Sequence, residues 1–165
     1  MFVDNNGIYA EPDDLPRIDV TQADANYSSH IADVEIMCRQ FPKSEAEIRR
    51  AIKGDELFCV MVSLERKIQA WAAFALIEND IFIESIAVKT EEHLKHVVDS
   101  LFDTVTWSPT GVEHPVVTIV WPEHETDSWL FKHLVANGWS AVALVKDRYT
   151  AYNQKWDGVL LVRQF

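Results

Sequence analysis

The sequence predicts an α/β protein with a mixed, mostly antiparallel sheet of six to seven strands and helices on both faces of that sheet. Two observations support this fold class. Apolar strand-like stretches and stretches with helical periodicity follow one another in the order β-α-α-β-β-β-α-β-α-β-β. In addition, the buried-strand pattern of residues 81–88 leads directly into the clearest helical pattern, at residues 90–105, and residues 116–121 then form a continuous apolar run.

The N-terminal segment differs in composition from the rest of the chain. Residues 1–16 are acidic and include Pro12 and Pro16, so we expect an extended arm rather than part of the core. Residues 17–165 are expected to form a single domain with a first strand at residues 17–21, because this length allows one substantial core and no linker to a second domain is visible.

Two helices are expected before the central strands. Apolar residues at helical spacing predict a first helix at residues 29–40, and Pro42 stops it. Ser44 and Glu47 form a capping box for a second, short helix. Gly54 closes this second helix.

Three strands follow, at residues 57–63, 68–77 and 81–88. Glu65-Arg66 is the expected turn between the first and the second of them. Asn79-Asp80 is the expected turn between the second and the third, because both residues tolerate positive φ.

The longest helix is expected to begin after Thr90, a plausible N-cap, and to have one apolar face. The residues expected on that face are Leu94, Val97, Val98, Leu101, Phe102 and Val105. The run at residues 116–121 is rich in β-branched residues, which is typical of a strand buried on both faces.

A last helix and two closing strands complete the prediction. Thr126 or Asp127 can cap the helix, which runs to Ala136. The closing strands are expected at residues 139–145 and 159–162. They are joined through Asp157-Gly158 or through a longer hairpin.

The composition restricts the function. The formal net charge of −11 repels nucleic acids and attracts basic peptides, although an acidic surface can also serve solubility alone. No apolar run approaches the roughly 18 residues of a spanning helix, so no membrane partner is expected. No secretory signal pattern is visible, and Cys38 and Cys59 have no zinc-site spacing. We therefore expect reduced thiols, no metal and a cytoplasmic location.

The element order from about residue 17 onward resembles the GNAT superfamily of N-acetyltransferases. The most specific likeness is the C-terminal stretch WLFKHLVANGWSAVALVKDRYTAYNQKWDGVLLVRQF, which is similar to the family's last helix, its Gly-aromatic turn (here Gly138-Trp139) and its two closing strands. The segment IFIESIAV, followed by a helix, is similar to the family's fourth strand and third helix.

This resemblance implies acetyl-CoA or another acyl-CoA as cofactor, lying across a splay between the family's fourth and fifth strands. The backbone of Ile86, Ala87 and Val88 would hold the pantetheine, and the loop opening the third helix would hold the pyrophosphate. The residues assigned to that loop are His93, Leu94, Lys95, His96 and Val98. The family's two loop glycines are replaced by His96 and Val98, and two glutamates, Glu91 and Glu92, stand in the first turn.

Glu84 is the best single candidate for catalysis. On a regular strand it shares a face with Phe82, Ile86 and Val88, so its carboxylate would be buried. Burial would raise the pKa of Glu84 and make it a general base for an amine. The alternative is a partly exposed glutamate paired with Lys or Arg.

Two further residues are candidates for proton transfer. His124 follows the strand at residues 116–121, at the end where open α/β sheets place ligands, although a solvated turn is the alternative. Tyr149 could donate a proton to a leaving group or simply pack on a half-buried strand. The tyrosine that the family often places in its last helix is replaced here by Leu134. His93 and His96 share a helix face, but no third metal ligand is evident.

Two hypotheses about function follow. The first is an acetyltransferase-like protein, an N-acyltransferase that moves an acyl group from acyl-CoA to a small-molecule amine or a basic peptide with Glu84 as base. The second is a GNAT-fold protein that has lost CoA and acts as a binding, regulatory or structural module with a protein partner. The resemblance favours the first, and the glycine-free, acidic helix start favours the second.

Overall fold

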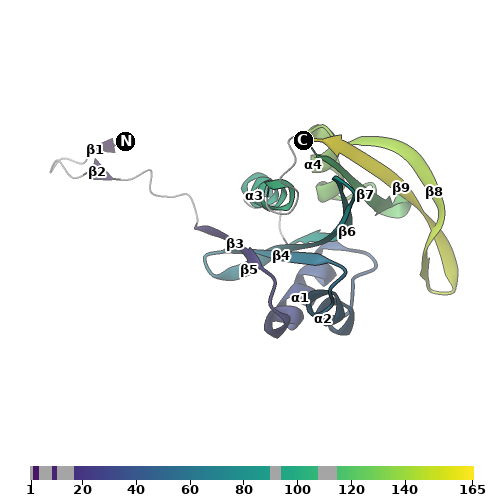
Figure 1. The fold of residues 1–165 in the computed structure, drawn as a ribbon, viewed down its shortest axis with the longest axis horizontal. Helices are drawn as coiled ribbons and strands as arrows, with labels where there is room; N and C mark the ends of the chain where they lie inside the picture. The colour runs from purple at the N-terminus through teal and green to yellow at the C-terminus, as the bar shows by residue number, and fades with distance from the viewer. Residues whose placement is uncertain (1, 4–8, 11–16, 90–93, 108–114) are drawn as a thin grey trace.

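The computed structural model describes residues 2–3, 9–10, 17–89, 94–107 and 115–165 (Figure 1). Its main sheet has seven strands in the order β3-β4-β5-β6-β7-β9-β8. These strands are β3 (Ile18–Gln22), β4 (Phe58–Leu64), β5 (Lys67–Ile77), β6 (Asp80–Val88), β7 (Val116–Pro122), β8 (Ser140–Ala151) and β9 (Gln154–Gln164). Within this sheet β6 and β7 are parallel and the other neighbours are antiparallel. The predicted mixed, mostly antiparallel sheet is confirmed.

The expected N-terminal arm lies mostly outside the described residues. Of residues 1–16, the structure describes β1 (Phe2–Val3) and β2 (Tyr9–Ala10), which pair with each other and not with the main sheet. The division into an arm and one domain therefore stays a prediction.

Helices cover both faces of the sheet, as expected (Figure 1). α1 (Ser28–Cys38) and α2 (Glu45–Lys53) lie on one face, and α3 (Leu94–Trp107) and α4 (Trp129–Ala136) lie on the other. Two 3₁₀ turns, η1 (Ala25–Tyr27) and η2 (Glu123–Glu125), precede α1 and follow β7. Among the described residues, no helix has both the length and the apolar character needed to cross a membrane.

The helix caps follow the expected chemistry with one correction. The Ser44 Oγ accepts a hydrogen bond from the Glu47 N–H at 3.2 Å, which confirms the N-terminus of α2. α4 is capped by Ser128, whose Oγ accepts from the Phe131 N–H at 3.2 Å. The prediction of Thr126 or Asp127 as cap was wrong because η2 and a turn occupy the residues directly after β7.

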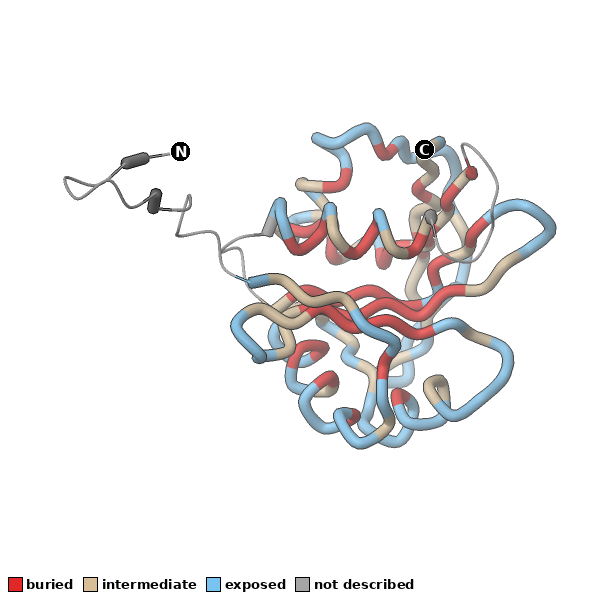
Figure 2. The backbone as a smooth tube through the Cα atoms, turned by 60° about the vertical axis from the view of Figure 1, so that its left-hand side comes forward, coloured by how far each residue is buried: buried red, intermediate tan, exposed pale blue. Residues whose placement is uncertain are grey.

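Each face of the sheet has its own hydrophobic core, and the burial of the chain follows these two layers (Figure 2). From α3, the core beneath that helix contains Val97, Val98, Leu101, Phe102 and Val105, as the periodicity predicts. Residues 90–93 and the side chain of Leu94 lie outside the description. The core beneath α1 and α2 contains Ile31, Val34 and Ile48 around the buried Trp71.

The hairpin turns show why the chain reverses where it does. Glu65 and Arg66 both have positive φ, 50° and 67°, in the predicted two-residue turn between β4 and β5. Between β5 and β6 the prediction was wrong by one residue: Ile77 pairs with Asp80, so the turn is Glu78-Asn79. The positive φ, 59°, is at Glu78.

The C-terminal hairpin is longer than the two predicted strands. Its turn is Tyr152-Asn153, both with positive φ, so the longer hairpin is confirmed and the turn at Asp157-Gly158 is wrong. Gly158 instead lies within β9 against β7, where a Cβ atom would come within 2.5 Å of the Val120 Cγ1. The glycine therefore permits close strand approach rather than a turn.

Candidate active site

The parallel pairing of β6 and β7 stops partway along both strands. The paired residues are Ile81 with Val117, Phe82 with Thr118 and Ile83 with Ile119. β6 continues to Val88 and β7 to Pro122 without further pairing between them. The two strands therefore splay apart beyond Ile83 and Ile119, as the resemblance implies.

A β-bulge sits at the start of this splay. On β5, Phe74 pairs with Ile83 and Ala73 with Ser85, which leaves Glu84 as the extra residue of β6. One extra residue exchanges the two faces of the strand, so Ile83 and Ile86 both enter the core beneath α3.

The bulge corrects the expectation for Glu84. Glu84 does not share a face with Ile86 and Val88, and its side chain is not buried but 35% exposed. The Arg148 Nη2 lies 3.9 Å from the Glu84 Oε2. The partly exposed glutamate paired with an arginine, the alternative left open by the sequence, is the observed arrangement.

A cleft of about 340 Å³ opens at the mouth of the splay, on the face covered by α1 and α2. It is lined by residues from α1, α2 and the connection between them, from β6 and β7, and from β8. These residues are Glu35, Arg39, Phe41, Pro42, Lys43, Glu47, Glu84, Ser85, Ile86, Ile119, Val120, Arg148, Tyr149 and Thr150. The cleft brings together two of the three predicted catalytic residues, Glu84 and Tyr149.

Ser85 is a cleft residue that sequence reasoning missed. It is 6% exposed, and its Oγ has no hydrogen-bond partner among the described residues. A buried hydroxyl without a partner is unfavourable unless a ligand or water satisfies it. Its position directly after the bulge is the signal, and the bulge is not visible in the residue pattern.

Tyr149 lies on the opposite flank of the cleft. Its hydroxyl donates to the Val120 carbonyl at 2.8 Å, at the first β7 residue beyond the parallel pairing. Burial raises the pKa of Tyr149, and the neighbouring Arg39 and Arg148 only partly oppose this. The phenol therefore keeps its proton at neutral pH.

An ion pair from α1 crosses the splay, and it too was missed from the sequence. The Arg39 Nε donates to the Glu125 Oε2 at 2.9 Å, and the two side chains are only 12% and 5% exposed. The Arg39 Nη1 donates to the Ile86 carbonyl at 3.0 Å, and its guanidinium lies 4.3 Å from the centre of a Trp121 ring. Arg39 thus connects the separated branches of β6 and β7.

This ion pair bears on the expected cofactor contacts. The Ile86 carbonyl is engaged by Arg39, and the Val88 backbone hydrogen-bonds to Cys38. Ala87 is buried in the core beneath α1 and α2. A pantetheine placed along β6, as the resemblance implies, would therefore meet the Arg39 side chain at the Ile86 carbonyl.

The residues expected at the pyrophosphate loop are only partly described. His93 lies outside the described residues, and Leu94 begins α3 without a described side chain. Lys95 and His96 are exposed, while Val98 is buried in the core beneath α3. Among the described residues, no group of three or more His, Cys, Asp or Glu side chains could hold a metal.

His124 is neither a cleft residue nor a solvated one. Its ring lies 4.7 Å from that of Phe41 and 4.6 Å from that of Trp156, measured between ring centres. Neither ring nitrogen has a hydrogen-bond partner in the described structure. This aromatic cluster attaches the β8–β9 hairpin to the connection between α1 and α2.

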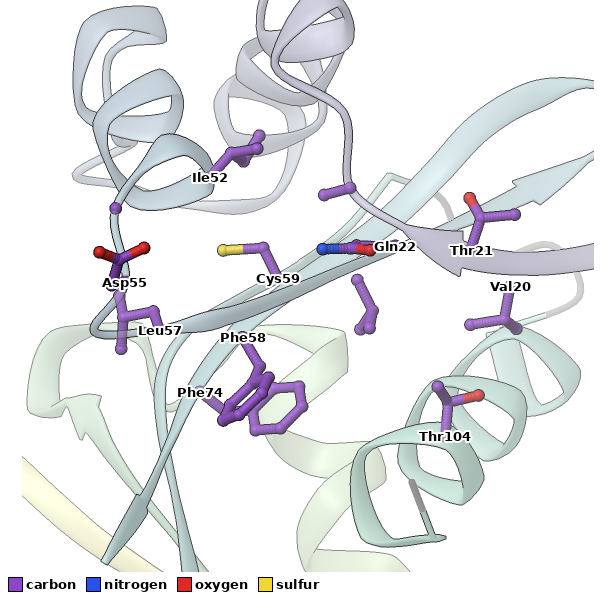
Figure 3. A pocket seen from close by; sticks show the side chains of 13 residues that line it. Val20, Thr21, Gln22, Ile52, Asp55, Leu57, Phe58, Cys59, Phe74 and Thr104 are labelled. Carbon is purple, nitrogen blue, oxygen red and sulfur yellow. The ribbon is translucent and has the colours of Figure 1, made fainter. Parts of the chain in front are cut away.

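A second cavity, of about 640 Å³, lies away from the splay where β3 ends beside β4 (Figure 3). The stacked rings of Phe58 and Phe74 line one part of it, and Cys59 projects from the opposite side of β4. Burial raises the pKa of the Cys59 thiol to about 11, so it stays protonated. Its described lining contains one carboxylate, Asp55, and neither a histidine to activate a nucleophile nor a tyrosine to donate a proton.

The described fold matches solved acetyltransferase structures. The chain is similar to the ribosomal-protein-S18-alanine N-acetyltransferase of Escherichia coli, with 12% identity, a TM-score of 0.69 and coverage of 90% of this chain and 94% of that one. It is also similar to a probable acetyltransferase of Staphylococcus epidermidis, with 10% identity, a TM-score of 0.69 and coverage of 90% and 99%.

A third similar structure contains the expected cofactor. It is a GNAT superfamily phosphinothricin acetyltransferase of Sinorhizobium meliloti in complex with acetyl-CoA, with 16% identity, a TM-score of 0.60 and coverage of 90% and 88%. No family model and no curated protein sequence matches the chain. The fold is that of the GNAT acetyltransferases.

Proposed function

We propose that this protein is an acetyltransferase-like enzyme that transfers an acyl group from acyl-CoA to an amine bound in the cleft. The observation that carries the proposal is the coincidence of the Glu84 bulge with the end of β6–β7 pairing, which brings a carboxylate and a protonated phenol to one splay. The similar structures named as acetyltransferases, one of them with acetyl-CoA, support it over the cofactor-free module.

Two residues of the cleft would transfer protons, Glu84 as the acceptor and Tyr149 as the donor. Bound acyl-CoA would supply the acyl group as an activated thioester. The Glu84 carboxylate would accept a proton from the acceptor ammonium, because only the neutral amine is a nucleophile. As the amine nitrogen bonds to the acyl carbon, the carbon–sulfur bond of the thioester breaks, and the Tyr149 Oη, which holds a proton at neutral pH, would donate it to the departing CoA thiolate.

The formal net charge of −11 of the whole chain favours a cationic acceptor. The lining of the cleft itself holds as many basic side chains (Arg39, Lys43 and Arg148) as carboxylates (Glu35, Glu47 and Glu84), so its own charges balance. Both oxygens of the third lining carboxylate, Glu35, already accept hydrogen bonds, from the Trp71 Nε1 and the Lys43 N–H. We infer a small amine or the N-terminus of a basic peptide as acceptor, and the unpartnered Ser85 Oγ would bond it.

The test is acetyl transfer to a panel of polyamines, amino acids and short basic peptides, followed by mass spectrometry of the acceptors. Glu84→Gln should lower kcat/KM by about 10²–10⁴-fold, the usual contribution of a general base. Glu78→Gln is the matched control, since it makes the same change in the exposed turn at the other end of β6. Acetylation of no acceptor, or full activity of Glu84→Gln, would contradict the proposal.

A further inference from the structure

We propose that Arg39 is a built-in competitor of the acyl-CoA, because its guanidinium closes the splay by holding the Ile86 carbonyl and Glu125 at once. The inference rests on the proposed function and adds a form of regulation to the same site. In it, the cofactor binds only to molecules in which the Arg39 side chain has swung away from β6.

Arg39 lies between the two branches of the splay. Its side chain donates hydrogen bonds to both, one to β6 at the Ile86 carbonyl and one to Glu125 on η2, beyond β7. The guanidinium also lies over the ring of Trp121, which is a β7 residue. Arg39 therefore occupies the space between two strands that have lost their mutual backbone hydrogen bonds.

The resemblance assigns this same space to the pantetheine. An amide N–H that approached the Ile86 carbonyl from the side of β7 would meet the Arg39 guanidinium, which already donates a charge-assisted hydrogen bond there. Because both groups need the same edge of β6, the Arg39 side chain and the pantetheine exclude each other at Ile86.

The Arg39 side chain can move away while its backbone stays in place. The connection after α1 is held independently, by the Gln40 N–H donating to the Glu125 Oε1 at 2.7 Å and the Lys43 N–H donating to the Glu35 Oε2 at 3.2 Å. Arg39 also lines the cleft, so its guanidinium can rotate into that open volume. Glu125 then retains the Gln40 hydrogen bond but loses its charge partner, and that loss opposes the opening of the splay.

Isothermal titration with acetyl-CoA tests the competition directly. The proteins are the wild type, Arg39→Met, and Arg39→Met with Glu125→Gln, which avoids an unpaired buried carboxylate if the single variant fails to fold. Arg49→Met is the matched control, because Arg49 forms an exposed ion pair with Glu45 on α2. Circular dichroism checks the fold of each protein.

Both Arg39 variants should bind acetyl-CoA at least tenfold more tightly than the wild type, whereas Arg49→Met should match the wild type. If the wild type binds acetyl-CoA as tightly as the Arg39 variants, or more tightly, Arg39 does not compete with the cofactor, and the proposed function still stands. Absence of binding in every protein, including the folded double variant, would overturn the proposed function and the competition together.

Discussion

The two halves of β6 differ in what holds them. The first half, at residues 81–83, pairs with β5 on one side and with β7 on the other, and its backbone is satisfied by regular ladders. The second half, at residues 84–88, keeps β5 but has lost β7. There, the side chain of Arg39 bonds the strand edge in place of a neighbouring strand.

The candidate site therefore arises where the sheet is interrupted. Because Glu84 is a single extra residue, the Ile86 side chain enters the same core as Ile83. The pairing of β6 with β7 ends at the same point. The bulge thus opens a cleft without loss of packing beneath α3. The same residue brings a carboxylate to the opening.

The largest predicted effect concerns the Arg39–Glu125 ion pair, which lies beside residues 84–88 of β6 where β7 no longer pairs. Arg39→Met should lower the free energy of unfolding by about 3–5 kcal/mol, because it leaves the Glu125 carboxylate buried without its charge partner. Adding Glu125→Gln should recover most of this loss, as measured by urea denaturation. Equal stabilities of the single and double variants would show that the pair does not bridge the splay.

The next effect tests whether both halves of β6 face one core. Ile86→Ala and Leu101→Ala should each lower the free energy of unfolding by about 2–5 kcal/mol, since both side chains are fully buried in the core between α3 and the sheet. Ile36→Ala, on the exposed face of α1, should change stability by less than about 0.5 kcal/mol. A cost near zero for Ile86→Ala would mean that the strand alternates without a bulge.

A smaller effect is expected on the β7 side of the splay. Tyr149→Phe removes the hydroxyl that donates to the Val120 carbonyl and should cost about 0.5–1.5 kcal/mol in thermal denaturation. Tyr27→Phe, at a largely exposed ring, should have no measurable effect. A neutral Tyr149→Phe would show that the Val120 carbonyl does not depend on this donor.

A further prediction concerns a reaction rate rather than stability, and it applies to the fully paired part of the sheet. Because burial raises the pKa of Cys59 to about 11, alkylation of the folded protein at pH 8 should be on the order of a hundredfold slower than for a free thiol. The rate should rise with pH through about 11, as the thiolate forms. Alkylation at the free-thiol rate at pH 8 would place Cys59 in an open region.

The sequence predicted the elements that repeat a simple pattern. The periodicity of α3, the capping box at Ser44 and the turn at Glu65-Arg66 all depend on local chemistry, and all agree with the structure within the described residues. The bulge at Glu84 depends instead on register against β5 and β7, which are distant along the chain. For the same reason, the long-range pair of Arg39 with Glu125 had no sequence signal.

A backbone amide NMR titration of the wild-type protein with acetyl-CoA tests most directly whether the cofactor binds where β6 and β7 have separated. Chemical shifts should change along residues 84–88 and 120–125, where the strands have separated, and change little at residues 81–83 and 117–119, where they are paired. Shifts confined to the second cavity, around Val20 to Ala23 and Phe58, would contradict binding of acetyl-CoA in the splay. Shifts at neither place would contradict it as well.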